Sequence, residues 1–300
     1  MIYRPPRDRA LPRHPAPYTD TLLPILAEFL PAGRAKILDP FAGTGKIARL
    51  RSWLPQAEFF GYEIEPEWAD QAREAGCVCT TGDSRQMHYP DDMFDAICTS
   101  PTYGNRMADH HNARDGSPRH TYRHTLGRPL TPGNSGALQW GEEYRTLHLA
   151  VWTECRRVLK PGGILVLNVK DHIRGGVLQE VTTWHAVTLL LLGLICINRV
   201  RVPCPGQRHG ANGHLRVDYE SVLQFRLGTH QATNQRSESP DPSVPPATDA
   251  EGNWATRAAR SGTPLDRLQD AGGWASPAMP LRYVEEAAIA NQGVLLGDRA

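Results

Sequence analysis

Four consecutive residues, Ser100-Pro101-Thr102-Tyr103, carry groups suited to chemistry on an amino group attached to an aromatic ring. Such an amino group is a weak nucleophile because its lone pair is delocalised into the ring. The Ser100 hydroxyl and the Pro101 carbonyl can each accept one of its hydrogens, which localises the lone pair on nitrogen. Tyr103 offers a face on which a flipped-out base can stack. The tetrapeptide therefore predicts group transfer to the exocyclic amino group of cytosine or adenine, by positioning and electrostatics.

A glycine-rich turn precedes this tetrapeptide in the chain. Residues 39–45 read Asp-Pro-Phe-Ala-Gly-Thr-Gly, and glycines at 43 and 45 let the backbone turn tightly and approach a ligand closely. The N-terminus of a following helix favours negative groups. Gly43, Gly45 and Ala48 also satisfy the dinucleotide-binding fingerprint, so an NAD(P)-dependent oxidoreductase stays an alternative.

Two acidic residues follow the next two predicted strands. Glu63 ends one strand and can accept hydrogen bonds from both ribose hydroxyls of an adenosine. Asp83 follows the other strand and is placed to accept from an adenine amino group. We therefore predict an adenosine-containing cofactor at these strand ends. The predicted cofactor-binding residues in this part of the chain are Asp39, Pro40, Phe41, Gly43, Thr44, Gly45, Glu63, Ile64, Asp83 and Ser84.

Strand-like and helix-like segments alternate from residue 35 to residue 227. We expect strands at 35–39, 58–63, 77–80, 94–99, 164–169, 196–202 and 221–226. We expect helices from about residue 46 and at 67–75, 142–159 and 178–192. The alternation predicts a doubly wound, mostly parallel, seven-stranded α/β sheet, which binds ligands at the carboxyl ends of its strands. The short last connection, which has no helix, predicts an antiparallel hairpin at one edge.

Two arginine-rich segments could contact a polyanion. The segment 104–141 has no periodicity, and a loop of that length in a compact domain is commonly functional or disordered. The segment 199–216 has no acidic residue and connects the last two strands. Arginine suits phosphate contacts and guanine recognition. The predicted DNA-binding residues are Arg106, Arg123, Arg199, Arg201, Arg208 and Arg216. Four histidines in 104–141 have no cysteine partner, so we predict no metal site.

Composition limits the remaining classes. A net charge of +1 excludes a uniformly basic nucleic-acid coat, so contacts must come from local basic loops. The 6 cysteines form no CxxC pair, which favours a reducing compartment. Residues 1–15 contain no apolar signal core, and the longest apolar run, 187–197, is too short to span a bilayer. We therefore expect a cytoplasmic protein without membrane contact.

Taken together, these motifs resemble the amino-methylating DNA methyltransferases that use S-adenosylmethionine, over residues 14–227. The resemblance implies a Rossmann-like class I methyltransferase domain, with Tyr18 and Thr19 in a further cofactor motif. It also implies a DNA substrate and, in some members, a cognate restriction endonuclease. Thr102 departs from the family, which has a second proline there. RNA amino-methylation and a catalytically weakened DNA-binding relic stay open, as does the choice between cytosine N4 and adenine N6.

The C-terminal part of the chain changes in composition. Residues 228–262 are polar and proline-rich, which predicts a disordered linker. Residues 263–300 resemble the final segment of phage-type tyrosine recombinases, with Trp274 and Tyr283 at the matching positions. The other residues of a recombinase catalytic set are not recognisable, so we expect a helical remnant without recombinase activity. That resemblance favours a gene on a prophage.

Overall fold

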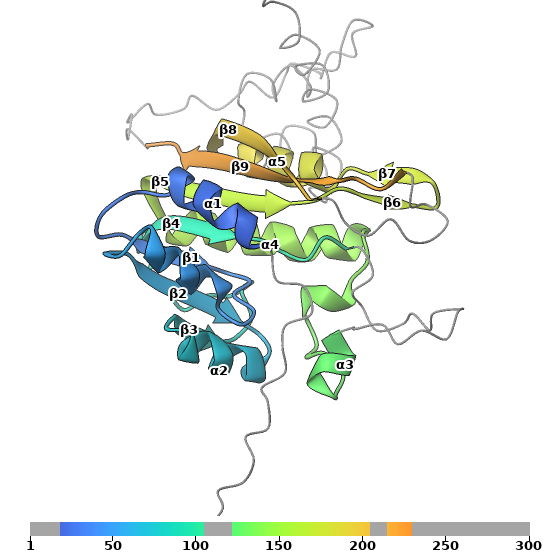
Figure 1. Cartoon of the computed structure of the whole chain (residues 1–300), viewed down its shortest axis with the longest axis horizontal. Helices are drawn as coiled ribbons and strands as arrows, with labels where there is room; N and C mark the ends of the chain where they lie inside the picture. Colours follow the sequence, from blue (N-terminus) through green and yellow to red (C-terminus); the bar gives the residue numbers. More distant parts are fainter. Residues whose placement is uncertain (1–18, 105–121, 205–214, 230–300) are drawn as a thin grey trace, which may run out of the picture.

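One seven-stranded sheet organises the chain (Figure 1). The computed structural model describes residues 19–104, 122–204 and 215–229. The strands of the sheet are β1 (Lys36–Asp39), β2 (Glu58–Glu63), β3 (Val78–Thr81), β4 (Phe94–Thr99), β5 (Leu159–Val169), β8 (Leu194–Pro203) and β9 (Tyr219–Leu227). Their order is β3-β2-β1-β4-β5-β9-β8. The first five strands in this order are parallel, and β9 is antiparallel to both β5 and β8. The predicted mostly parallel Rossmann-like sheet with an antiparallel edge is confirmed.

Helices cover both faces of this sheet. The helices are α1 (Leu23–Phe29), α2 (Pro66–Glu74), α3 (Tyr122–Leu126), α4 (Glu142–Val158) and α5 (Val181–Leu191), with short 3₁₀ helices η1 (Asp20–Leu22), η2 (Lys46–Ser52) and η3 (Ser135–Ala137). One buried cluster packs α1, η2 and α2 against strand residues such as Ile37 and Phe59. A second cluster packs α4 and α5 against the next residues of the same strands, Leu38 and Phe60. Apolar side chains thus fill both faces, as parallel strands require.

Four local predictions differ from the structure. The strand expected at 164–169 begins five residues earlier, because Leu159 already pairs with Phe94 of β4. The helix expected from about residue 46 is the 3₁₀ helix η2. The helix expected at 178–192 begins at Val181, because a small hairpin of β6 (His172–Arg174) and β7 (Val177–Gln179) precedes it. The sequence predicts no regular structure within 104–141, but its described part contains α3 and η3. These elements are too short to produce a periodic pattern. The domain predictions for 228–262 and 263–300 lie outside the described residues.

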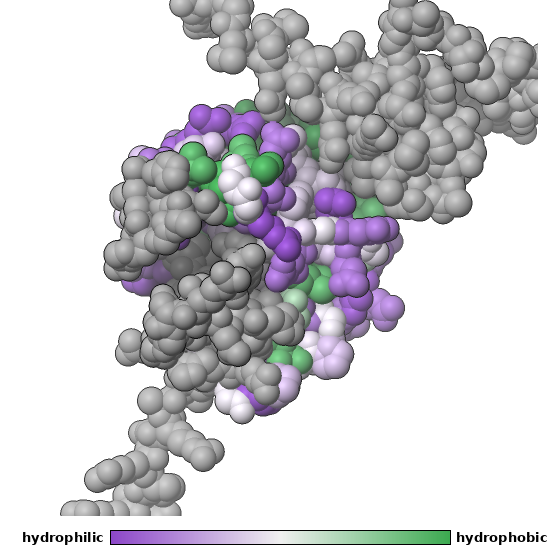
Figure 2. Space-filling view, turned by 90° about the vertical axis from the view of Figure 1, so that its right-hand side faces the viewer, coloured by the Kyte–Doolittle hydropathy of each residue, from purple (hydrophilic) through white to green (hydrophobic). Residues whose placement is uncertain are grey.

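The described surface seen in Figure 2 is predominantly hydrophilic, with small separate hydrophobic patches. Among the described residues, no helix is long and apolar enough to cross a bilayer.

Gly45 has a packing role that the sequence motif alone does not reveal. Its φ of 76° lies in the left-handed region, and a Cβ added there would stand 2.6 Å from the Cα of Ala72 in α2. The second glycine of the turn therefore lets α2 pack directly against the turn after β1.

We predict that Gly45→Ala lowers the free energy of unfolding by about 2–4 kcal/mol, since it adds a backbone clash to the left-handed strain. Gly33 is the matched control, because its φ is 87° and nothing lies within 4 Å of an added Cβ. Gly33→Ala should lower it by only about 1 kcal/mol. Urea denaturation of both variants measures the difference, and equal losses would contradict the close approach of α2.

Candidate active site

A cavity of about 220 Å³ opens at the carboxyl ends of β1 to β4. The turns that follow these four strands supply about half of its lining residues. Of the residues predicted from the sequence, it is lined by Pro40, Phe41, Glu63, Ile64, Asp83, Ser84, Ser100, Pro101, Thr102 and Tyr103. The structure thus brings the catalytic tetrapeptide and the predicted cofactor acids to one cavity.

Asp39 lies beneath this cavity, at the end of β1. Its side chain is buried, and its Oδ1 accepts hydrogen bonds from Thr99 Oγ1 at 2.6 Å and from the Phe41 amide at 3.0 Å. Burial raises the pKa of Asp39 to about 6, against the lowering effect of these two bonds. Asp39 therefore joins the end of β1 to the end of β4, directly before Ser100.

Glu63 is held by the glycine-rich turn. Its Oε2 accepts a hydrogen bond from the Gly43 amide at 2.8 Å, and its Oε1 accepts one from the Glu65 amide at 2.9 Å. Burial raises the pKa of Glu63 to about 7, and the two amide bonds oppose that rise. Each oxygen keeps a further lone pair that can accept from a ligand hydroxyl. Gly43, Thr44 and Gly45 themselves are not among the described residues that line the cavity.

The turn after β3 is fastened to the turn after β1. Ser84 donates a hydrogen bond from its hydroxyl to the Pro40 carbonyl at 2.5 Å. The Arg85 guanidinium bonds both oxygens of Asp83, from Nε at 3.0 Å and from Nη2 at 2.5 Å. Asp83 Oδ1 also accepts a hydrogen bond from the Arg85 amide at 2.9 Å, and Asp83 lines the cavity.

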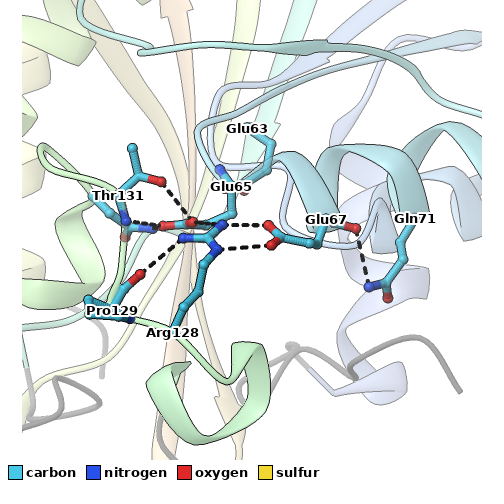
Figure 3. A network of polar contacts seen from close by, with 8 residues as sticks. Glu63, Glu65, Glu67, Gln71, Arg128, Pro129 and Thr131 are labelled. Atoms are coloured by element: carbon cyan, nitrogen blue, oxygen red, sulfur yellow. Dashed lines mark hydrogen bonds and ion pairs between the residues drawn. The ribbon is translucent and has the colours of Figure 1, made fainter. Parts of the chain in front are cut away.

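An ion-pair network joins the segment that follows α3 to the start of α2 (Figure 3). The Arg128 guanidinium bonds Glu67 through Nε at 2.9 Å and Glu65 Oε2 through Nη2 at 2.7 Å. Glu65 is fully buried and also accepts from the Thr131 amide at 2.8 Å and from Asn134 Nδ2 at 2.7 Å. The segment 128–134 is thereby fixed across the start of α2, and Asn134 and the adjacent Ser135 reach the cavity wall.

The catalytic tetrapeptide is tied to this segment and to α4. Ser100 Oγ and the Tyr103 hydroxyl lie 2.9 Å apart. Thr102 Oγ1 donates to Ser135 Oγ at 3.0 Å, a bond that a proline at this position could not make. The Thr102 carbonyl accepts a hydrogen bond from the Tyr144 hydroxyl. Thr102, where the resemblance led us to expect a proline, thus holds the loop through a side-chain hydrogen bond.

A chain of buried hydrogen bonds from Trp152 through His185 determines that the Tyr144 hydroxyl donates to the Thr102 carbonyl. The indole Nε1–H of Trp152 donates to His185 Nδ1 at 3.0 Å, so that nitrogen is the unprotonated one. Burial lowers the pKa of His185 well below its ordinary range, so the ring is neutral and carries its proton on Nε2. That nitrogen lies 2.9 Å from the Tyr144 hydroxyl, whose own proton is therefore free for Thr102. Every donor and acceptor along this line is satisfied.

The remaining predicted residues do not line the cavity or lie outside the described residues. Thr19 is exposed, and its hydroxyl lies 2.8 Å from that of Thr21. Arg199, Arg201 and Arg216 are exposed, and the Arg201 guanidinium lies 4.6 Å from the centroid of the Tyr219 ring. Tyr18, Arg106 and Arg208 and the side chain of Arg123 lie outside the described residues. The roles of these residues stay predictions.

Sequence reasoning missed several cavity residues. These residues are Tyr62, Trp68, Tyr122, Gly133, Asn134, Ser135, Leu147, Val151 and Glu220. The i, i+4 spacing of Leu147 and Val151 marked the inner face of a helix, and Tyr62 directly precedes Glu63. Asn134 and Glu220 gave no such local signal.

No protein-family model and no curated protein sequence matches the chain. Among solved structures, it is similar to the cyclase SpnF, with 18% identity, a TM-score of 0.45 and coverage of 70% of this chain and 82% of that one. It is similar to a SAM-dependent methyltransferase from Methanosarcina mazei, with 13% identity, a TM-score of 0.44 and coverage of 69% and 98%. For TrmN from Thermus thermophilus the values are 18%, 0.41, 69% and 47%. At these identities and scores, the similarities assign neither activity nor substrate to this chain.

We predict that Arg128→Gln lowers the free energy of unfolding by about 2–3 kcal/mol, because it leaves the buried Glu65 carboxylate without its cation. Arg49→Gln is the control, since Arg49 and its partner Asp20 are each 58% exposed. The control should change stability by about 0.5 kcal/mol. Urea denaturation compares them, and similar losses would contradict a stabilising role for the Arg128 network.

The raised pKa of Glu63 predicts a pH dependence of stability. Its folded-state pKa of about 7 exceeds the ordinary 4.5, so the folded protein binds this proton more tightly. The resulting stabilisation is complete below pH 4.5 and is lost as the pH rises through 7. Relative to Glu63→Gln, the wild type should lose up to about 3 kcal/mol between pH 4 and pH 8. Urea denaturation of both proteins across this range tests it, and a constant difference would refute the raised pKa.

Proposed function

We propose that this chain is an S-adenosylmethionine-dependent methyltransferase that modifies the exocyclic amino group of cytosine or adenine in DNA. One observation carries the proposal: Ser100 to Tyr103 line the same cavity as the strand-end acids Glu63 and Asp83. The first group suits an aromatic amine and the second suits an adenosine. Methyl transfer joins these two chemistries in one reaction.

The cavity residues fit the cofactor. Glu63 would accept from the ribose hydroxyls, Asp83 from the adenine amino group, and the Ile64 side chain would contact the apolar adenine face. When bound, S-adenosylmethionine supplies an electrophilic methyl group on a sulfonium sulfur. Glu63 and Asp83 are prepositioned by the amides of Gly43 and Glu65 and by Arg85, respectively.

The tetrapeptide prepares the target nitrogen. The Ser100 hydroxyl and the Pro101 carbonyl would accept its two hydrogens, and Tyr103 would stack on the base. The Asp39–Thr99 bond and the Tyr144–Thr102 bond hold both ends of this loop, so little reorganisation is needed when a base enters. Positioning of this kind favours an active enzyme over a weakened DNA-binding relic.

The sheet argues against the oxidoreductase alternative. Dinucleotide-binding sheets have the strand order 3-2-1-4-5-6, whereas here the antiparallel β9 lies between β5 and β8. For the polymer, Arg199, Arg201 and Arg216 are exposed at the β8–β9 edge, where they would contact phosphates. We propose DNA over RNA on the resemblance of the motifs, and a cognate restriction endonuclease as a partner.

Two measurements test this function. Isothermal titration should detect S-adenosylhomocysteine binding and no NADH binding. With tritiated S-adenosylmethionine, the wild type should label unmethylated DNA, and Ser100→Ala should reduce the rate by about 100-fold because one acceptor is lost. Tyr103→Ala should reduce it by about 10- to 100-fold through lost stacking.

Ser52→Ala is the matched control, since it removes an exposed hydroxyl from η2, and Ser52 is not among the cavity-lining residues. It should transfer methyl groups at the wild-type rate. Label in RNA but not in DNA would reassign the polymer. An absence of label in both at saturating cofactor would refute the proposed function.

A further inference from the structure

A carboxylate from the antiparallel strand faces the catalytic tetrapeptide. Glu220, the second residue of β9, is only 7% exposed and lines the same cavity as Ser100 and Tyr103. No predicted role accounts for it, and an acid in the buried part of a strand requires an explanation, because a desolvated carboxylate destabilises the fold unless it is compensated.

Asn168 at the end of β5 connects Glu220 to the tetrapeptide. Its Nδ2 lies 2.8 Å from Glu220 Oε2, 3.2 Å from Ser100 Oγ and 3.1 Å from the Tyr103 hydroxyl. The amide has two hydrogens for these three acceptors, and its Oδ1 has no hydrogen-bond partner within the described residues. The fully buried Asn168 thus joins Glu220, Ser100 and Tyr103 through its Nδ2, while its Oδ1 stays without a hydrogen bond among the described residues.

The three cavity carboxylates differ in their compensation. Glu63 accepts two backbone amides, and Asp83 is paired with Arg85. Glu220 forms no ion pair within the described part of the chain, where its other oxygen accepts only a weak bond from Cys204 Sγ at 3.5 Å. The nearby Lys170 ammonium donates to the Cys204 carbonyl at 3.4 Å instead. An acidic side chain without a cationic partner among the described residues therefore lies beside the position proposed for the target base.

We propose that Glu220 stabilises the positive charge that forms on the target nitrogen, and that Asn168 couples this charge to Ser100. The inference rests on the proposed function. In the reaction, the nitrogen lone pair forms a bond to the methyl carbon, the carbon–sulfur bond breaks, and its electron pair stays on sulfur as a neutral thioether. The nitrogen is then cationic until it releases one proton to water. Ser100 is neutral, so Glu220 supplies the counter-charge that the tetrapeptide lacks.

The test compares Glu220→Gln, which removes the charge at constant size, with Glu220→Asp, which keeps it. Single-turnover transfer of tritiated methyl groups to unmethylated DNA should fall by about 10- to 100-fold in Glu220→Gln and by less in Glu220→Asp. Affinity for S-adenosylhomocysteine and KM for DNA should stay within about twofold, since ground-state binding does not use the charge. Glu28→Gln, an exposed site on α1, is the control and should match the wild type.

Thermal unfolding distinguishes loss of the Glu220 charge from misfolding of the Glu220→Gln variant. Because Glu220→Gln removes an uncompensated buried charge, its Tm should equal or exceed that of the wild type. The inference is overturned if Glu220→Gln transfers at the Glu28→Gln rate, if Glu220→Asp is equally impaired, or if Glu220→Gln lowers Tm and abolishes cofactor binding. Wild-type protein that labels neither DNA nor RNA would instead remove the proposed function, and this role with it.

Discussion

One buried carboxylate determines how the two halves of the cavity are spaced. Asp39 ends β1, and Thr99 ends the neighbouring parallel strand β4, so their bond fixes the glycine-rich turn against the start of the catalytic tetrapeptide. The parallel arrangement brings both turns to the same edge of the sheet, and the bond sets their separation. Burial makes the Asp39 charge unfavourable, and its raised pKa is the sign of that strain.

Local sequence signals sufficed for the sheet and for half of the cavity. Apolar runs ended by Asp39, Glu63 and Thr99 placed the strands within a residue or two, because buried parallel strands have a continuous apolar pattern. Once a doubly wound sheet is inferred, the turns after β1, β2, β3 and β4 must converge. Residues 100–103 and Glu63 accordingly line one cavity at these strand ends.

The other half depends on contacts between distant positions. Arg128 and Glu67 lie 61 positions apart, and Asn168 and Glu220 lie 52 apart. Neither pair has a periodic or motif-like signal, since each residue in isolation reads as an ordinary polar position. Only the folded sheet, which inserts β9 next to β5, brings Glu220 to the tetrapeptide. The β6–β7 hairpin is local and was missed for a different reason, since its three-residue strands are too short for a periodic pattern.

The distribution of charge in the cavity suits a reaction that moves a positive charge without creating one. In the proposed transfer, the positive charge leaves the cofactor, whose proposed site holds two carboxylates already satisfied by amides and by Arg85. It ends on the target nitrogen, beside Glu220, which has no cation within the described residues. The carboxylates of the cavity therefore attract the positive charge less strongly on the cofactor than on the target nitrogen. Such a difference stabilises the transition state of methyl transfer more than the ground state. A lysine fixed beside Glu220 would neutralise the attraction at the target nitrogen and remove this difference. An additional cation beside Asp83 would weaken the attraction at the cofactor and increase the difference.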